Sequence, residues 1–248
     1  YKRLECGDSI HSRRRRIRTR SALDSSQVDE FSVLSTRYNA TAFGTLAFAT
    51  ASLLGRLLLG RTPPTGSDGP RLLNLGCGRQ LLSGFVNADF FWYTLRRASA
   101  ARPDWLLDLR YPLKCNADYW DGVFCEHALE HLYPHEALRL LHEIRRTLKP
   151  QAVLRVTVPD LGKYVRNYLA DSRETGFSRW PTGAEALRSL TQNWGHLSLW
   201  DAELLGRFLS EAGFTSVTAR SFRSGEDQRL LRDSPERSWE TLYMECKK

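Results

Sequence analysis

Short apolar runs alternate with amphipathic helical patterns from residue 71 to the end of the chain. The seven runs, each typical of a strand, are RLLNL (71–75), FVNAD (85–89), WLLDL (105–109), DGVFCE (121–126), VLRVTVP (153–159), FTSVTARSF (214–222) and ETLYMEC (240–246). Strands that alternate with helices pair mostly in parallel, and their sheet is covered on both faces. The pattern predicts a doubly wound α/β fold whose ligands bind at the carboxyl ends of the strands.

Two of the intervening helices carry boundary signals. Pro134 suits a first helical turn, where no amide donor is needed. The apolar residues after it fall on one helical face, namely Ala137, Leu141, Ile144 and Leu148. Asp201 is a suitable N-cap for a later helix, and Gly213 is placed to end it.

Small and acidic residues stand at the ends of the first three runs. Gly76 and Gly78 allow a ligand to approach the backbone closely, but position 81 is leucine, so the dinucleotide fingerprint is incomplete. Asp89 can accept hydrogen bonds from both hydroxyls of a ribose, and Asp108 can accept from an adenine amino group. Each residue alone also fits an ordinary turn, whereas their combination indicates a site for an adenosyl group.

Seven sequence motifs that point to one protein family occur in order along residues 72–214. They are LNLGCG and GFVNAD (72–89), DLRYPL (108–113), DGVFCEHALEHL (121–132), EIRRTLKP (143–150), LRVTVPDL (154–161) and GHLSLWDAELLGRFLSEAGF (195–214). With them, the chain resembles a class I S-adenosylmethionine-dependent methyltransferase of the type 11 group, in a branch found among sugar and cell-envelope pathway proteins. The resemblance implies S-adenosylmethionine as cofactor and a seven-stranded sheet whose last strand is antiparallel.

The resemblance also implies roles for individual residues. Gly76, Cys77 and Gly78 are then beside the methionine part of the cofactor, Asp89 at the ribose, and Asp108 with Leu109 at the adenine, while Glu126 and His127 face the sulfonium and the acceptor. Leu75 and Phe90 are also expected to be cofactor-binding residues. Phe90 begins an aromatic run (90–93) that either walls the adenine pocket or forms a hinge. Only thirteen positions separate Gly76 from Asp89, so we expect a loop in place of the first helix and an open pocket.

Three histidines are candidates for a base that assists an oxygen acceptor. His127 is the first choice for its position after the fourth strand, and His196 and His131 are the second choices. Each could instead be a capping or packing residue. The segment 162–195 is read as an insertion after the fifth strand, and it carries two tyrosines and two tryptophans. It is predicted to shape an acceptor pocket or lid, or to form a small core.

A rival motif overlaps the first two histidines. HALEH (127–131) has the H-x-x-E-H pattern of inverted zinc peptidases, in which both imidazoles would bind zinc and Glu130 would act as base. The motif is short, and Pro134 cuts its helix, so this function is a remote alternative and no metal is expected. The five cysteines lack paired spacing and indicate free thiols in a reducing, cytoplasmic compartment.

The positive charge belongs mainly to the first residues. Residues 1–20 hold eight basic and two acidic residues, whereas the remainder holds 28 basic and 26 acidic ones, so nucleic acid is not expected as a partner.

The apolar run 40–59 could span a bilayer, lie at its surface or pack on its own domain, and Arg56 weighs against spanning. A linker at 61–70 places the domain boundary at about residue 65, between a basic tail with a helical extension (1–65) and the methyltransferase-like domain (66–248).

These observations favour an O-methyltransferase acting on a small molecule or glycan. The alternative is a catalytically inactive relative that binds the cofactor or a protein partner. Residues 1–59 permit contact with a membrane surface, and the sequence does not determine the acceptor or the oligomeric state.

Overall fold

The computed structural model describes residues 42–64, 69–91, 102–170 and 175–248, so the basic tail lies outside the described residues. One seven-stranded sheet has the order β3-β2-β1-β4-β5-β7-β6. Its strands are β1 (Leu72–Leu75), β2 (Phe85–Asp89), β3 (Trp105–Leu106), β4 (Trp120–Glu126), β5 (Leu148–Pro159), β6 (Thr215–Arg220) and β7 (Thr241–Lys247). β7 runs antiparallel to both of its neighbours, β5 and β6. The predicted α/β sheet with an antiparallel last strand is confirmed.

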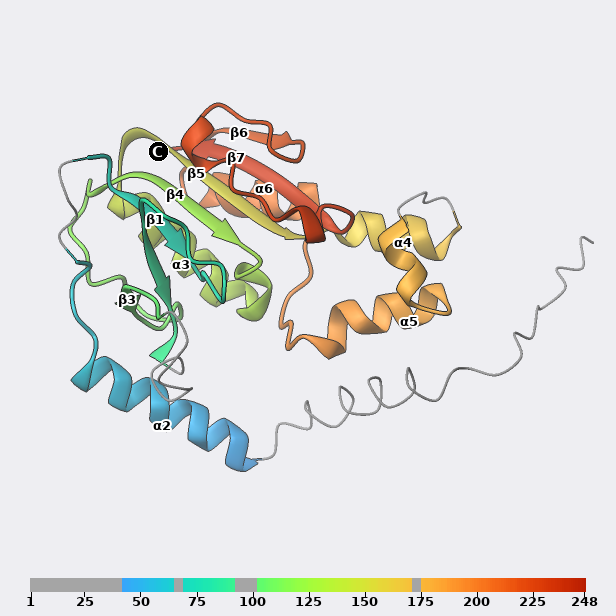
Figure 1. Cartoon of the computed structure of the whole chain (residues 1–248), viewed down its shortest axis with the longest axis horizontal. Helices are drawn as coiled ribbons and strands as arrows, with labels where there is room; N and C mark the ends of the chain where they lie inside the picture. The colour runs from blue at the N-terminus through green and yellow to red at the C-terminus, as the bar shows by residue number, and fades with distance from the viewer. Residues whose placement is uncertain (1–41, 65–68, 92–101, 171–174) are drawn as a thin grey trace, which may run out of the picture. The chain divides into compact units, whose positions relative to one another are not determined.

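Helices α3 (Pro134–Thr147) and α6 (Ala202–Glu211) lie side by side against one face of the sheet (Figure 1). Pro134 begins α3 as predicted, and Asp201 caps α6 by accepting a hydrogen bond from the Leu204 amide at 2.8 Å. The leucines that α6 turns inward, Leu205 and Leu209, are fully buried. These amphipathic faces and the alternate residues of β1, β4 and β5 form the main core.

The opposite face of the sheet is covered by the connection between β6 and β7. Leu230, in the short 3-10 helix η5 (Gln228–Leu230), packs there on Leu72, Phe85 and Phe124. Arg155 of β5 points to this same face, because its neighbours Leu154 and Val156 belong to the main core. The sheet is therefore covered on both faces, by helices on one and largely by this connection on the other.

The apolar run of residues 40–59 forms helix α2 (Ala42–Leu58), which belongs to one compact unit with the rest of residues 38–248. A Cβ atom at Gly55 would lie 2.2 Å from the ring of Phe91, so the glycine permits close packing of the helix on the domain. The Arg56 guanidinium lies 3.5 Å from the centre of the Tyr111 ring. Within the part of the chain that is described, no helix is both long and apolar enough to cross a membrane. The contacts favour the hypothesis of a helix packed on its own domain, and the boundary at residue 65 stays a prediction.

The segment that follows β5 is partly helical. It holds α4 (Leu161–Tyr168), η3 (Thr175–Arg179), α5 (Gly183–Arg188) and the single π-turn η4 (Ser189–Asn193). Tyr164 and Phe177 are buried in a second small core, against which Trp180 and Trp239 pack. Trp194 differs, because it is 49% exposed and faces the cleft described next.

Candidate cofactor and acceptor site

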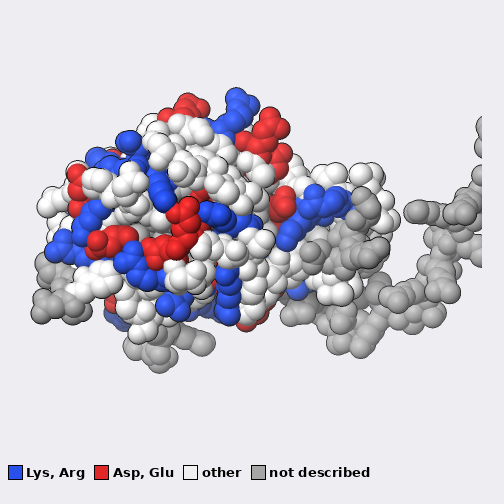
Figure 2. Space-filling view, turned by 90° about the horizontal axis from the view of Figure 1, so that it is seen from above, with Lys and Arg blue, Asp and Glu red and all other residues white. Residues whose placement is uncertain are grey.

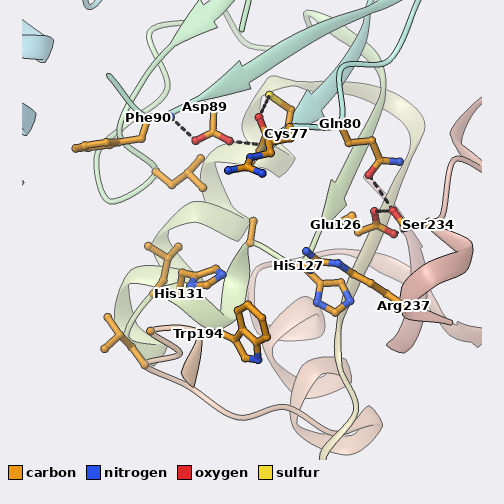
Figure 3. A pocket seen from close by; sticks show the side chains of 18 of the residues that line it. Cys77, Gln80, Asp89, Phe90, Glu126, His127, His131, Trp194, Ser234 and Arg237 are labelled. Carbon is orange, nitrogen blue, oxygen red and sulfur yellow. Dashed lines mark hydrogen bonds between the residues drawn. The ribbon is translucent and has the colours of Figure 1, made fainter. Parts of the chain in front are cut away.

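A cleft of about 1130 Å³ opens at the carboxyl ends of β1, β2 and β4 (Figure 3). The parallel register of these strands brings their ends to one edge of the sheet. Ten of the predicted site residues line the cleft, namely Gly76, Cys77, Gly78, Asp89, Phe90, Asp108, Leu109, Glu126, His127 and His131. Two others do not line it: Leu75 is fully buried in the main core, and His196 borders a smaller neighbouring cavity.

The loop after β1 is held against the end of β2. The amides of Gly76 and Cys77 both donate to the Ala88 carbonyl, at 2.9 and 3.1 Å. Gly76 has φ +72°, and a Cβ atom there would lie 2.6 Å from the Ala128 Cβ, so the position requires glycine. Burial and the nearby charge of Asp89 raise the pKa of the Cys77 thiol to about 12, so the thiol remains neutral.

Asparagines explain why residues 76–84 form a loop without a helix, as the short spacing predicts. The buried side chain of Asn87 accepts hydrogen bonds from the Asn74 amide group at 2.9 Å and from the Leu82 backbone at 2.7 Å. Asn74 also donates to the Gln80 carbonyl at 2.8 Å. The loop is thus tied to side chains of β1 and β2, a role that no local sequence pattern indicated.

Asp89 ends β2 and faces the cleft. Its two oxygens accept one backbone hydrogen bond each, from Gly78 and from Phe90, both at 2.6 Å. A carboxylate has about four acceptor positions, so two remain for hydroxyl groups such as those of a ribose. Burial raises the pKa of Asp89 above its usual value, although the two amides and His131 oppose this shift.

Asp108 is held differently. Arg110 donates to it from the backbone at 3.0 Å and from the guanidinium at 3.0 and 2.7 Å, and Ser52 of α2 also donates to it. Burial raises the pKa of Asp108, but these hydrogen bonds and the Arg110 charge outweigh it, and the pKa lies below its usual value. Because its acceptor positions are occupied, the predicted adenine contact requires Arg110 or Ser52 to give up a bond. That role stays a prediction.

An aromatic pair extends the cleft wall beside Asp108. Phe90 stacks on Phe48 of α2, with ring centres 4.6 Å apart and planes at 20°. Phe91 is instead buried, at 3% exposure, and the last two aromatics of the run, residues 92 and 93, lie outside the described residues. The helical extension therefore contributes a wall of the cleft that the sequence pattern did not indicate.

The connection between β6 and β7 supplies the opposite wall. Ser234 donates to both oxygens of Glu126, from its amide at 2.9 Å and its hydroxyl at 2.5 Å, and its hydroxyl lies 3.0 Å from the Gln80 side chain (Figure 3). Arg237 lines the cleft from the same connection. Sequence reasoning missed these residues, and the only available signal was the unusually charged composition of residues 223–240.

A buried ion-pair network fixes this connection to the sheet. Arg155 is fully buried and binds both oxygens of Asp233, at 2.7 and 2.6 Å, and one oxygen of Glu245 at 3.0 Å. Asp233 directly precedes Ser234. The network therefore determines where Ser234 meets Glu126.

His127, the first choice for a base, has both ring nitrogens engaged. Its Nε2 lies 2.8 Å from the Thr241 hydroxyl, which donates its only hydrogen to the Arg237 carbonyl at 2.7 Å, so Nε2 must be the donor. Its Nδ1 lies 3.3 Å from the buried carboxylate of Glu130. This arrangement orients Glu130 and leaves neither nitrogen of His127 available to an acceptor without rearrangement.

His131 and His196 approach each other although 65 positions separate them in the sequence. Their ring centres lie 5.0 Å apart. Burial lowers the pKa of His196, together with the charge of His131, although Glu130 opposes this shift. Burial also raises the pKa of Glu130, but the bond and charge of His127, with the charges of His131 and His196, hold that pKa below its usual value.

The geometry does not support the zinc-peptidase alternative. Residues Leu129–His131 form a single 3-10 turn, and His127 has φ +49°, outside helical geometry. His127 and His131 therefore do not share a face of an α-helix, as zinc binding by that motif would need.

The sheet order and this cleft at the ends of β1, β2 and β4 define a class I S-adenosylmethionine-dependent methyltransferase, whose cofactor is S-adenosylmethionine. The chain belongs to the methyltransferase-domain family, whose model matches residues 48–219. A search of curated proteins found no match.

Solved structures similar to this chain include two S-adenosylmethionine-dependent methyltransferases. The protein from Archaeoglobus fulgidus shares 17% identity over 88% of this chain and 99% of its own, with a TM-score of 0.48. The protein from Mesorhizobium loti shares 18% identity over 81% of this chain and 100% of its own, with a TM-score of 0.44.

Proposed function

We propose that the protein transfers a methyl group from S-adenosylmethionine to an oxygen atom of a small molecule or glycan. The observation that carries this proposal is the convergence of the Gly76–Gly78 loop and Asp89 on one cleft whose far wall holds His131. The resemblance to methyltransferases of sugar and cell-envelope pathways supports a glycan as acceptor.

The residues present fit the cofactor. Gly76 and Gly78 line the cleft at the end of β1, and Asp89 has acceptor positions left for ribose hydroxyls. When bound, the cofactor supplies an electrophilic methyl group on a sulfonium, so the protein mainly aligns the acceptor and excludes water. A cleft of about 1130 Å³ exceeds the usual range of about 300–1,000 Å³ for one ligand. This size supports the presence of an acceptor beside the cofactor.

Methyl transfer to a hydroxyl also requires loss of its proton. His131 is exposed and lines the cleft, and it is the histidine best placed to receive that proton. Glu126 is held by Ser234, and His127 by Glu130 and Thr241, so both act as positioning residues in this proposal.

An inactive relative that only binds the cofactor or a protein remains the alternative function. No large region of one charge sign dominates the face shown in Figure 2, where basic and acidic side chains are interspersed. This distribution supports a small acceptor over nucleic acid. The described cysteines are all free thiols, which supports the prediction of a reducing, cytoplasmic location. Contact of residues 1–59 with a membrane surface stays a prediction.

Calorimetric titration with S-adenosylhomocysteine tests the cofactor site. We expect the wild-type protein to bind it and Asp89→Ala to bind at least about 100-fold more weakly, because two charge-assisted hydrogen bonds of about 1.5–3 kcal/mol each are lost. Asp121→Asn is the matched control, since Asp121 lies at the opposite end of β4 and pairs with Lys149. A wild-type protein that fails to bind would refute the proposed function.

The acceptor is tested separately. Transfer of a labelled methyl group to panels of sugars and phenols should show turnover with at least one hydroxyl compound. Turnover only with amines would overturn the oxygen assignment, and binding of S-adenosylhomocysteine without turnover on any panel would favour the inactive relative.

A further inference from the structure

Three potential metal ligands meet beside the cleft. One ligand atom of each of Glu130, His131 and His196 lies within 4.8 Å of the others. We propose that these three side chains bind a divalent transition-metal cation of the zinc type. This site differs from the H-x-x-E-H interpretation, because His196 comes from a distant segment and takes the place of His127.

Glu130 is a buried carboxylate that is only partly partnered. Its side chain is 1% exposed, and the carboxylate oxygen Oε2 has no hydrogen-bond partner among the described residues. The other oxygen, Oε1, lies 3.3 Å from Nδ1 of His127. Buried carboxylates are normally hydrogen-bonded, paired or bound to metal. The second oxygen, Oε2, is therefore available as a metal ligand, while His127 orients the group.

His196 is held in the tautomer that a metal requires. Its Nδ1 lies 2.6 Å from the Leu190 carbonyl oxygen, which can only accept a hydrogen bond, so Nδ1 carries the proton. The lone pair is then on Nε2. Metal-binding histidines commonly donate their other ring N–H to a backbone carbonyl or carboxylate in this way. The π-turn η4, which precedes His196, supplies that carbonyl.

The donor set selects the kind of cation. Two imidazoles and one carboxylate are the ligands of many catalytic zinc sites, which keep a further position open. In tetrahedral coordination with metal–ligand bonds of about 2.0–2.2 Å, two ligand atoms lie about 3.3–3.6 Å apart. The three ligand atoms lie within 4.8 Å of one another, so binding would draw them closer together, and His131 is the exposed one of the three side chains.

The location gives the cation a role at the acceptor. His131 also lines the large cleft, so a cation that it binds would lie beside that cleft. Such a cation would orient an acceptor oxygen and lower the pKa of a bound hydroxyl. With the cation bound, His131 would be a ligand and could not also act as the base, and the proton of the hydroxyl would pass to solvent. This consequence rests on the proposed function, whereas metal binding itself does not.

Calorimetric titration of metal-free, full-length protein with zinc chloride tests the site. We expect one zinc equivalent per chain, with a rise in melting temperature that follows zinc concentration. We expect His131→Ala and His196→Ala each to weaken zinc binding by at least about 10–100-fold. That range is typical for the loss of a residue that only supports a metal ligand, and loss of the ligand itself should cost no less. His131 is exposed, so His131→Ala is expected to fold, and circular dichroism without zinc checks this.

His142→Ala is the matched control, because His142 is an exposed histidine on α3 and is not one of the three proposed ligands. It should bind zinc as the wild type does. The proposal is overturned if the wild type binds no zinc, or if His131→Ala and His196→Ala bind it with unchanged affinity. Titration of the wild type with S-adenosylhomocysteine is independent of these results, so a failure of the proposed function is distinguishable from a failure of the metal site.

Discussion

Replacement of Arg155 by methionine should destabilise the protein strongly. Methionine preserves much of the side-chain volume but leaves Asp233 and Glu245, at 0% and 2% exposure, without their guanidinium partner. Asp233 keeps one hydrogen bond, from the Arg223 amide at 2.6 Å, and Glu245 keeps Arg220 at 3.2 Å. Breaking a buried ion pair by removing one partner typically costs about 3–5 kcal/mol.

This cost is measurable in two ways. Urea denaturation gives the free energy of unfolding, and a loss of about 3–5 kcal/mol corresponds to a fall in melting temperature of about 6–20 °C for a domain of this size. Arg155→Met should also weaken binding of S-adenosylhomocysteine, because the connection that carries Ser234 loses its anchor on the sheet. The double variant with Asp233→Asn should recover part of the lost stability, since the unpaired charge is then removed.

Arg229→Met is the matched control. Arg229 pairs with Asp227 at 2.6 Å, but its side chain is 45% exposed, and surface ion pairs contribute about 0–1 kcal/mol. If Arg155→Met costs no more than Arg229→Met, the argument that a buried network anchors the cleft wall is refuted.

Three further predictions concern single positions. Gly76→Ala should lower the free energy of unfolding by about 2–4 kcal/mol in urea denaturation, because alanine is disfavoured at φ +72° and its Cβ meets Ala128; a loss below 1 kcal/mol would contradict the close approach. Asp89→Asn should change stability in a pH-dependent way: asparagine loses one of the two amide bonds at every pH, but at neutral pH it also removes a charge whose burial disfavours the folded state. The folded state binds the proton more tightly than the unfolded state, so this favourable contribution should vanish as the pH falls below the usual value of 3.8, and the variant should become less stable relative to the wild type; unfolding curves across pH check it, and a stability difference independent of pH would oppose it. Gln151→Gly should stabilise the protein by about 0.5–1 kcal/mol, since Gln151 is exposed with φ +65°, and equal melting temperatures would argue against strain there.

The strands could be predicted because their signals are local. All seven apolar runs become strands, and most boundaries agree within two residues. Two runs differ for physical reasons. β3 ends at Leu106, because the chain turns so that Asp108 can be held by Arg110 and Ser52. β5 begins five residues early, at Leu148, because Leu148 already pairs with Trp120 of β4 before the register shifts.

The cleft could be predicted only in part. Gly76 and Asp89 directly follow strands, so the parallel topology carries both to one edge. The partners that hold the site could not be inferred, because Ser234 meets Glu126 across 108 positions and Ser52 meets Asp108 across 56. No periodicity or motif encodes contacts at such separations.

Hydrophobic periodicity and the residues at strand ends determine, from the sequence alone, the α/β class and the edge of the sheet that carries the cleft, since both depend on neighbours within a few positions. The tertiary structure decides which side chains close the cleft and how their charges are balanced. His127 is turned from a free base into a partner of Glu130 and Thr241 only when β4 and β7 pack around it, and His196 reaches His131 only when the segment after β5 folds back. Chemistry at this site depends on burial and distance, which are properties of the folded chain.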